Sequence, residues 1–245
     1  MERDIIYGRN AVLEALRGDR AVKEVFISNS VPKGAFNNMT ATLKARRIPF
    51  HFRSPEWLKR TANSDSHQGI VAIIDAVRYS SLGEILGIAK SREEPPFIIV
   101  LDGIEDPQNL GSIIRSAECA GAHGIIIPEH RAVGITPAVV RVAAGATEHM
   151  KVAIVDKISK ILEELGENGV KVIGSDAQAK VKYCNVPMRE GVAIVIGGEG
   201  EGMKRSTADA CDVLVSIPLK GKLNSLNAAV SAAILMFEVV RQRSK

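Results

Sequence analysis

The residues best suited to chemistry are polar side chains at three points where an apolar run gives way to a helix-like segment. The stretch LDGIEDPQNLGSIIRSAECAGA carries Asn109 and Arg115, the loop IGGEGEGMKRS carries Glu199, and IPLKGKLNSLNAAV carries Ser225 and Asn227. Carboxylate, amide and guanidinium groups can orient a substrate hydroxyl or stabilise charge that develops on it. The three stretches are therefore candidates for one shared site.

The glycine loop, residues 197–203 with the sequence GGEGEGM, raises a question about the charge of its ligand. Glycine loops after strands commonly bind phosphate because their bare amides attract an anion. Glu199 and Glu201 would repel one, and neither GxGxxG nor GxxxxGK[ST] occurs. A neutral adenosine with a cationic sulfonium would tolerate these carboxylates. The simpler alternative is a tight turn with solvated glutamates.

The other two stretches also have structural alternatives. Asn109 is placed like a helix N-cap, and Arg115 could pair with Glu118 on the helix surface. Either Asn224 or Ser225 could cap the last helix. A single cap does not account for the other polar residues of the NSLN sequence, and this excess favours a ligand site.

The second part of the chain alternates between strand-like and helix-like segments. From Phe97 onward the runs FIIVLD, GIIIP, KVAIV, KVIGSD, VAIVIG and VLVSIP are rich in β-branched residues. Helices are predicted at 110–120, 158–165 and 226–241. This alternation predicts a mostly parallel sheet covered on both faces, with ligands bound beyond the carboxyl ends of its strands.

The first part reads as a smaller α/β unit. Helices are predicted near 10–16, 35–46 and 55–60, with strands in EVFIS, PFHF and GIVAIIDAV. The segment YSSLGEILGIAKSREEPP then reads as a linker with one short helix. We expect a first domain at 1–78, a linker at 79–96 and a second domain at 97–245.

Composition indicates an ordinary soluble globular protein, with 46% hydrophobic and 24% charged residues in 245. Aromatic residues make up only 4%, which argues against an aromatic platform for stacking bases. The start MERDIIYGRN lacks the apolar core of a signal peptide, and no run approaches the roughly 20 apolar residues of a membrane span. We expect a cytoplasmic protein without a membrane partner.

The distribution of charge indicates the kind of partner, and the cysteine spacing indicates whether disulfides or a metal site are expected. Residues 1–78 hold 13 Lys and Arg against 8 Asp and Glu, a difference of +5, while the remainder holds 19 against 20. A basic module suits a polyanion, although a chance excess would give the same count. The three cysteines are odd in number and lack CxxC spacing, so neither a disulfide framework nor a metal site is predicted.

Taken in order, NLGSIIRSAECAGA, IGGEGEGM and IPLKGKLNSLNAAVSAA resemble the three motifs of the SpoU/TrmH family. These are RNA ribose 2′-O-methyltransferases of the SPOUT class that use S-adenosylmethionine. IIYGRNAVLEAL and SHQGIVAII are similar to the substrate-binding domain of large-subunit ribosomal RNA guanosine methyltransferases. The resemblance implies a small L30e-like α/β domain, then a SPOUT α/β domain with a trefoil knot, and a homodimer through the catalytic domains.

The resemblance also implies roles for individual residues. The implied catalytic residues are Asn109, Arg115, Glu199, Ser225 and Asn227. The implied cofactor-binding residues are Gly197, Gly198, Ile217, Leu219 and Leu226. Arg115 could act as a base, stabilise the developing alkoxide or bind a substrate phosphate.

The resemblance favours a guanosine of large-subunit ribosomal RNA as substrate, with transfer RNA as the alternative and no role for DNA. Two further alternatives remain from the sequence. A nucleotide-dependent dehydrogenase could use a parallel sheet, but the dinucleotide fingerprint is missing. A non-catalytic RNA-binding assembly factor would use only the basic first domain.

Overall fold

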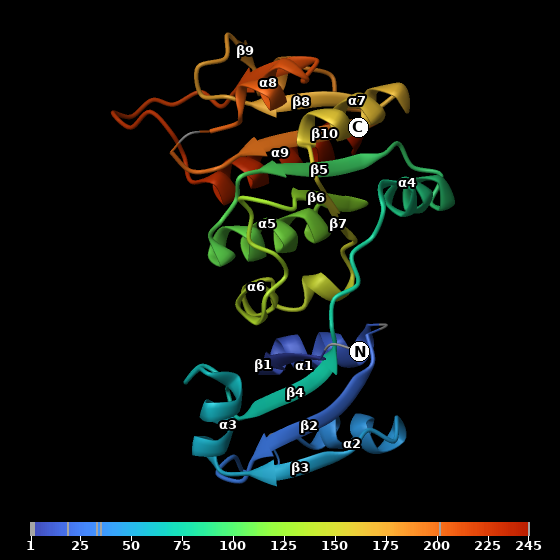
Figure 1. Cartoon of the computed structure of the whole chain (residues 1–245), viewed down its shortest axis with the longest axis vertical. Coiled ribbons are helices and arrows are strands. Elements are labelled where there is room, and N and C mark those ends of the chain that lie inside the picture. The colour runs from blue at the N-terminus through green and yellow to red at the C-terminus, as the bar shows by residue number, and fades with distance from the viewer. Residues whose placement is uncertain (1–2, 19, 33, 35, 201, 245) are drawn as a thin grey trace. The chain divides into compact units, whose positions relative to one another are not determined.

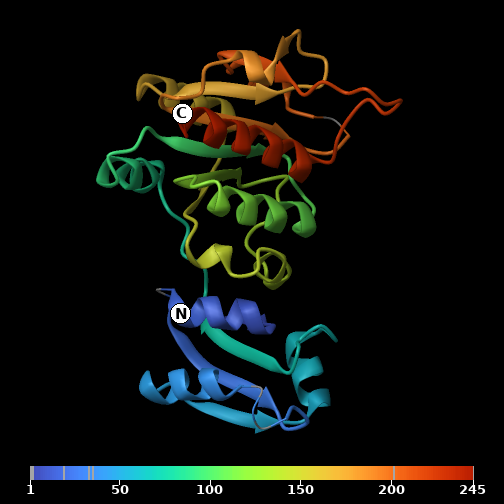
Figure 2. The same cartoon turned by 180° about the vertical axis from the view of Figure 1, so that it is seen from behind.

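The structure is a computed structural model that describes residues 3–18, 20–32, 34, 36–200 and 202–244, and its contacts divide the chain into two units. The first unit is Met1–Arg78 with Ile135–His149, and the second is Tyr79–Gly134 with Met150–Lys245. Figures 1 and 2 show both from opposite sides. This division differs from the expected one, because the expected linker belongs to the second unit and Ile135–His149, here called the α6 segment, belongs to the first.

The first unit contains a four-stranded sheet in the order β1-β4-β2-β3. Its strands are β1 (Arg3–Tyr7), β2 (Val22–Ser28), β3 (Phe50–Arg53) and β4 (Ile70–Asp75). Its helices are α1 (Arg9–Arg17), α2 (Asn37–Ala45), α3 (Pro55–Ala62), α6 (Pro137–Val142) and a 3-10 helix at Ala146–Glu148. Strand β4 is antiparallel to both neighbours, and β2 and β3 are parallel. The predicted small α/β unit is confirmed, with β1 as an additional strand.

Charged and aromatic contacts attach the α6 segment to this sheet. The Arg141 guanidinium lies 5.9 Å from the centre of the Tyr7 ring. Arg20 donates to Glu148 at 3.0 Å and to Asp4 at 2.9 Å. The Glu148 side chain has no solvent-exposed area. Burial raises the pKa of its carboxyl, and the neighbouring Arg20 opposes that rise.

The second unit contains a seven-stranded sheet in the order β7-β6-β5-β10-β8-β11-β9. Its strands are β5 (Phe97–Asp102), β6 (Gly124–Pro128), β7 (Val152–Val155), β8 (Lys171–Ser175), β9 (Val181–Lys182), β10 (Val192–Gly197) and β11 (Val213–Ser216). Its helices are α4 (Leu82–Ser91), α5 (Pro107–Cys119), α7 (Ile158–Glu167), α8 (Arg205–Asp209), α9 (Ala228–Arg243) and a 3-10 helix at Tyr183–Asn185. Every strand pair is parallel, which confirms the predicted sheet.

Helices cover both faces of this sheet. Ile98 and Val100 of β5 pack in one core with α4 and α7. Helices α5 and α9 contact each other and cover the other face, which is nearer the viewer in Figure 2. Because α4 buries Leu82 and Ile85 in the core, residues 79–96 are not a free linker. Among the described residues, no helix is both long and apolar enough to cross a membrane.

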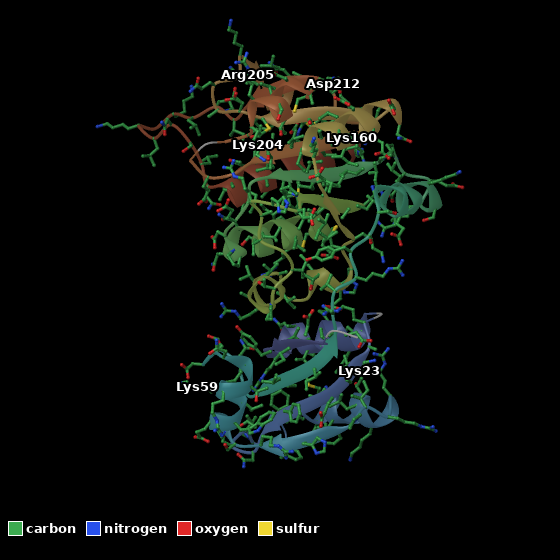
Figure 3. All side chains as sticks on the ribbon, viewed as in Figure 1. Lys23, Lys59, Lys160, Lys204, Arg205 and Asp212 are labelled. Carbon is green, nitrogen blue, oxygen red and sulfur yellow. The ribbon has the colours of Figure 1, made fainter. Side chains whose placement is uncertain are left out.

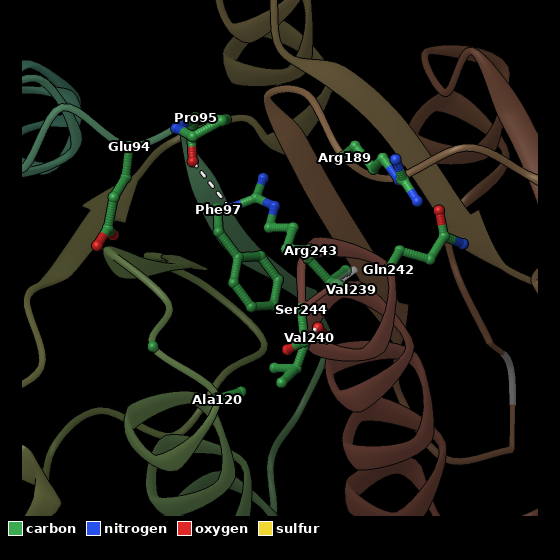
Figure 4. A pocket seen from close by; sticks show the side chains of 11 residues that line it. Glu94, Pro95, Phe97, Ala120, Arg189, Val239, Val240, Gln242, Arg243 and Ser244 are labelled. Atoms are coloured by element: carbon green, nitrogen blue, oxygen red, sulfur yellow. Dashed lines mark hydrogen bonds between the residues drawn. The ribbon is translucent and has the colours of Figure 1, made fainter.

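Arg243 fastens the end of α9 to the amino end of β5. Its guanidinium donates to the carbonyl oxygens of Pro95 at 2.9 Å, Pro96 at 3.0 Å and Glu190 at 2.7 Å. It also lies 5.4 Å from the centre of the Phe97 ring. Figure 4 shows Arg243, Pro95 and Phe97 beside a cavity of about 470 Å³ at this end of the strand. The basic end of α9 therefore anchors the chain at this end of the sheet.

The turns after β5 and β10 approach each other closely enough to require glycine. A Cβ on Gly198 would overlap the carbonyl oxygen of Gly103. Gly103 has a φ of 89°, a conformation that favours glycine. The Gly198 amide donates to the Asp102 carbonyl at 2.8 Å, which keeps the two turns in contact.

We expect Gly198→Ala to destabilise the protein by about 1–3 kcal/mol, because the added methyl would force backbone apart. Gly87→Ala is the matched control. Gly87 is exposed in α4 with open space around its Cβ, so alanine should stabilise by about 0.5–1 kcal/mol through helix propensity. Urea unfolding followed by circular dichroism measures both. A Gly198→Ala midpoint equal to that of the unmodified protein would contradict this packing.

Candidate active site

The three stretches with candidate residues meet at the carboxyl edge of the seven-stranded sheet. Strands β5 and β10 are neighbours, with Gly197 opposite Asp102 in register. Helix α5 follows β5, the glycine loop follows β10, and the loop 217–227 connects β11 to α9. Parallel strands end at the same edge, and the sheet order β5-β10-β8-β11 brings these segments together there.

Asn109, Glu199 and Asn227 form a closed hydrogen-bonded group, here called the Asn–Glu–Asn cluster. The Asn109 Nδ2 donates to Glu199 Oε1 at 2.7 Å. The Asn227 Nδ2 donates to Glu199 Oε1 at 3.0 Å and to Asn109 Oδ1 at 2.9 Å. Asn109 is buried, whereas Glu199 and Asn227 are exposed. The cluster thus holds the exposed Glu199 carboxylate through a hydrogen bond from the buried Asn109 side chain.

Asn227 is oriented by the helix that it begins. Its Oδ1 accepts from the backbone amides of Ala229 at 2.9 Å and Val230 at 3.2 Å, so Asn227 is the N-cap of α9. Because the oxygen faces the helix, the amide nitrogen must face Glu199. The prediction that Asn224 or Ser225 caps this helix is wrong, since α9 begins later than the sequence pattern indicated.

The predicted cap of α5 is also displaced. Asp106 is the N-cap, with Oδ1 accepting from the Gln108 amide at 3.1 Å, and Pro107 opens the helix. Asn109 lies inside the helix rather than at its cap. Its side chain is therefore free of a capping role and turns to Glu199.

Glu199 retains one carboxylate oxygen for a ligand. Both amide donors use Oε1. Within the described part of the chain, no hydrogen bond to Oε2 occurs. A carboxylate oxygen in this state can accept a hydrogen bond from a substrate hydroxyl.

Arg115 and Ser225 lie outside the cluster. Arg115 follows Asn109 by six positions on α5, so the two side chains leave the helix in different directions. Arg115 is exposed and makes no hydrogen bond or ion pair with the described residues, including Glu118. Ser225 is exposed and likewise makes no hydrogen bond to the cluster, but it lines the neighbouring cavity.

A cavity of about 810 Å³ adjoins the cluster. The residues implied to bind cofactor that line it are Gly197, Gly198, Ile217, Leu219 and Leu226. Glu199, Ser225 and Asn227 line it as well. Its volume falls in the range of about 300–1,000 Å³ that is typical of small-molecule sites.

Part of this wall is formed by residues that were not predicted from the sequence. Ser175, Asp176 and Gln178 line the cavity from the end of β8, the strand between β10 and β11. The polar residues that close the run KVIGSD were the available signal, but strand order is not legible from sequence. Asp176 Oδ1 accepts from the Gln178 amide at 2.7 Å, and among the described residues no hydrogen bond to its second oxygen occurs.

The cavity is acidic. Asp176 and Glu199 are carboxylates, and no lysine, arginine or histidine lines it among the described residues. This charge disfavours a pyrophosphate and favours a ligand with a cationic group. Glycine at position 197 also allows the loop to fold tightly on itself, because a Cβ on Gly197 would overlap the backbone of Gly202 and Met203. Glu201 lies outside the described residues.

Cys211 lies behind the glycine loop and is unsuited to act as a nucleophile. A Cβ on Gly174 would meet both Cys211 Sγ and Met203 Cε. Burial raises the pKa of the Cys211 thiol to about 12, so the thiol stays protonated at neutral pH. The polar chemistry of the site therefore rests on its amides and carboxylates.

Both parts of the chain match families of known proteins. A model of the SpoU rRNA Methylase family matches residues 96–237, and one described as RNA 2′-O ribose methyltransferase substrate binding matches residues 5–80. Over 243 residues the chain is 40% identical to YacO of Bacillus subtilis (strain 168), which is named as a TrmH family tRNA/rRNA methyltransferase. That match covers 99% of this chain and 97% of YacO.

Solved structures share the fold. The SpoU methyltransferase AviRb from Streptomyces viridochromogenes, in complex with AdoMet, matches with a TM-score of 0.84 and 24% identity over 99% of this chain and 91% of AviRb. An AdoMet-bound rRNA methyltransferase from Sinorhizobium meliloti matches with a TM-score of 0.79 and 24% identity over 98% of this chain and 87% of its own. With its two parts matched in order and its relative matched nearly end to end, the chain belongs to the SpoU rRNA methylase family and is a methyltransferase.

Proposed function

We propose that this chain transfers the methyl group of S-adenosylmethionine to the ribose 2′-oxygen of a guanosine in large-subunit ribosomal RNA. The observation that carries the proposal is an acidic, partly apolar cavity that shares Glu199 and Asn227 with the Asn–Glu–Asn cluster. A cationic sulfonium with a neutral adenosine fits that charge, whereas the pyrophosphate of a nicotinamide dinucleotide does not. The dehydrogenase alternative is thereby disfavoured.

The residues present fit this cofactor. Glycine backbone at Gly197 and Gly198 would lie along the adenosine, and Ile217, Leu219 and Leu226 supply apolar walls. The carboxylates of Asp176 and Glu199 match hydroxyl, ammonium or sulfonium groups. When bound, S-adenosylmethionine supplies a methyl group that is activated by its positive sulfur.

The cluster would prepare the 2′-hydroxyl for reaction. That oxygen must lose its proton as it bonds to the methyl carbon, and Glu199 Oε2 is placed to accept the hydrogen bond from the hydroxyl. Asn109 and Asn227 hold the carboxylate by Oε1, so its free oxygen has a fixed direction. Ser225, which lines the same cavity, would contact the ribose or the cofactor.

Arg115 would act on the RNA rather than on the cluster. Its exposed guanidinium is positioned on the helix that carries Asn109 but makes no contact with Glu199 among the described residues. A planar guanidinium binds a phosphate or a developing alkoxide through two parallel hydrogen bonds. Proton abstraction is a poor role for it, because arginine stays protonated.

We expect Glu199→Gln to lower kcat about 100- to 10,000-fold, because the amide keeps the Oε1 acceptor but loses the carboxylate. Cofactor affinity should change less than about tenfold, since several other groups line the cavity.

Arg115→Lys should lower kcat/KM for RNA about tenfold, because lysine lacks the planar pair of N–H donors that a guanidinium offers to a phosphate. Labelled methyl transfer and calorimetric cofactor binding measure these effects. Full activity of either variant would remove that residue from the mechanism.

The RNA assignment rests on the basic first unit and on the match of residues 5–80 to a substrate-binding model. Ribosomal RNA is proposed because this domain resembles the substrate-binding domain of large-subunit ribosomal RNA guanosine methyltransferases. Transfer RNA is the alternative substrate. An RNA substrate of this kind also implies a cytoplasmic location and no requirement for a membrane or DNA.

We expect label from S-adenosylmethionine to enter unmodified large-subunit ribosomal RNA at one guanosine 2′-oxygen and not to enter transfer RNA. Mapping of the methylated nucleotide identifies the position. Label at one position of transfer RNA alone would overturn the ribosomal assignment but keep the chemistry. No label in either RNA despite cofactor binding would contradict the proposed reaction on both.

The same proposal includes a homodimer through the second unit. Val230 and Phe237, seven positions apart on α9, are 47% and 48% exposed, and Ile234 between them is partly exposed. The opposite side of α9 is buried against the sheet through residues such as Leu235 and Val239. A helix that is apolar on both sides is typical of one covered twice, and a second copy supplies a matching apolar face. The trefoil knot stays an expectation of the family resemblance.

We expect Phe237→Asp to convert a dimer to a monomer, because the new charge would be buried at an apolar interface. Val181→Asp is the control, since Val181 is 39% exposed on the edge strand β9. Sedimentation velocity at several concentrations measures the mass. An unmodified chain that sediments as a monomer, or a Phe237→Asp dimer, would refute the interface.

A further inference from the structure

The few aromatic residues of this chain are concentrated in its first unit. Six of the ten Phe, Tyr and Trp residues lie within residues 1–78. Four of these six, Phe26, Phe50, Phe52 and Trp57, lie on β2, on β3 or at the start of α3. The low overall aromatic content therefore conceals a local cluster, which the argument from whole-chain composition did not consider.

Strand β3 is the edge of its sheet, as Figure 1 shows, and among the described strands it pairs with β2 alone. Successive side chains of a strand point to opposite faces. His51 and Arg53 therefore share one face, while Phe50 and Phe52 share the other, where their ring centres are 6.2 Å apart at 80°. Phe52 is 58% exposed although it contacts Phe50, so a large apolar side chain faces solvent at this edge.

A stack of flat groups lies on the His51 and Arg53 face. The rings of Phe26 and Trp57 are 4.5 Å apart. The Arg53 guanidinium lies 5.8 Å from the centre of Phe26 and 5.7 Å from that of Trp57. His51 stacks on Phe26 at 6.0 Å and 29°, and its Nε2 also contacts Glu24 at 3.0 Å. An exposed arginine already stacked on aromatic rings offers its other side to a further planar group.

Exposed cations lie next to the stack. Arg53 is exposed at the end of β3, and Arg60 follows Trp57 by three positions on α3, so the two share a face of that helix. Lys59 of α3, labelled in Figure 3, is paired with Asp65 at 2.7 Å. The combination of exposed flat groups with an excess of positive charge matches a polyanion with planar bases. A duplex would not use the exposed flat groups, because paired bases are not available for stacking.

We propose that the β3 edge of the first unit, with Phe52 on one face and the Arg53–Trp57 stack on the other, binds an unpaired segment of the RNA substrate and stacks its bases. This rests on the proposed function in taking RNA as the substrate. It adds which surface of the first unit contacts the RNA, and that the target lies beside single-stranded nucleotides rather than within an uninterrupted duplex.

The test uses the full chain and one mixed-sequence oligoribonucleotide, free or annealed to its complement. Trp57 is the only tryptophan of the chain, so its fluorescence reports directly on this surface. The single strand should quench Trp57 emission, and the duplex should bind more weakly without quenching. Binding of the single strand with unchanged Trp57 emission would overturn the proposal.

Substitutions at Phe52 separate stacking from general hydrophobicity. Phe52→Leu should weaken binding of the single strand about 5- to 100-fold, because it keeps the apolar volume but loses the ring face. Phe52→Tyr, the matched control, should bind like the unmodified chain. The salt dependence of Phe52→Leu should be unchanged, since no phosphate contact is removed. Equal affinities of the leucine and tyrosine variants would refute the stacking surface, while methyl transfer by the unmodified chain would leave the proposed reaction intact.

Discussion

The site depends on one interaction, the pair of amide hydrogen bonds that fixes Glu199 between α5 and the start of α9. These bonds join residues 90 and 28 positions apart in the chain, and each crosses between segments that follow different strands. A carboxylate on a glycine loop would otherwise sample many directions, because glycine leaves the backbone permissive. Asn227 caps α9 with its side-chain oxygen and donates to Glu199 with its side-chain nitrogen. The folding of that helix and the direction of Glu199 are therefore coupled. An Asn227 substitution would mix a helix defect with a catalytic one, whereas Glu199 can be changed without removing a cap.

Packing at the glycine turns sets how closely these segments meet. Gly103 and Gly198 place two backbones in contact where any side chain would separate them. Separation there would carry Glu199 away from Asn109 on the neighbouring helix. The glycines of the loop therefore do more than admit a ligand, since the same residues that shape the cavity wall also hold its carboxylate in reach of its amide donors.

The sequence predicted the sheet and the three junctions well, because periodic β-branched runs and alternating helices are local signals. It misplaced both caps, since Asp106 and Asn109, or Ser225 and Asn227, are equally acceptable N-caps by residue type and only the final backbone path selects one. The division of the chain was harder. Arg20 and Glu148 are 128 positions apart, and no local sequence pattern predicts that they pair. The stacking surface was hidden for a different reason, because composition averages over the whole chain.

The α6 segment shows why the first unit is not simply the first 78 residues. Arg20 is only 14% exposed and distributes its donors among Asp4, the Asp75 carbonyl and Glu148. Without the α6 segment, Arg20 would lose its contact with a fully buried carboxylate, and the ring of Tyr7 would lose Arg141. With the segment in place, one oxygen of Glu148 is buried without a partner among the described residues, which is costly. Glu148 is retained there as part of a network with Arg20 and Asp4. That network binds the loop between β6 and β7 to the first unit, so the chain passes between the two units more than once.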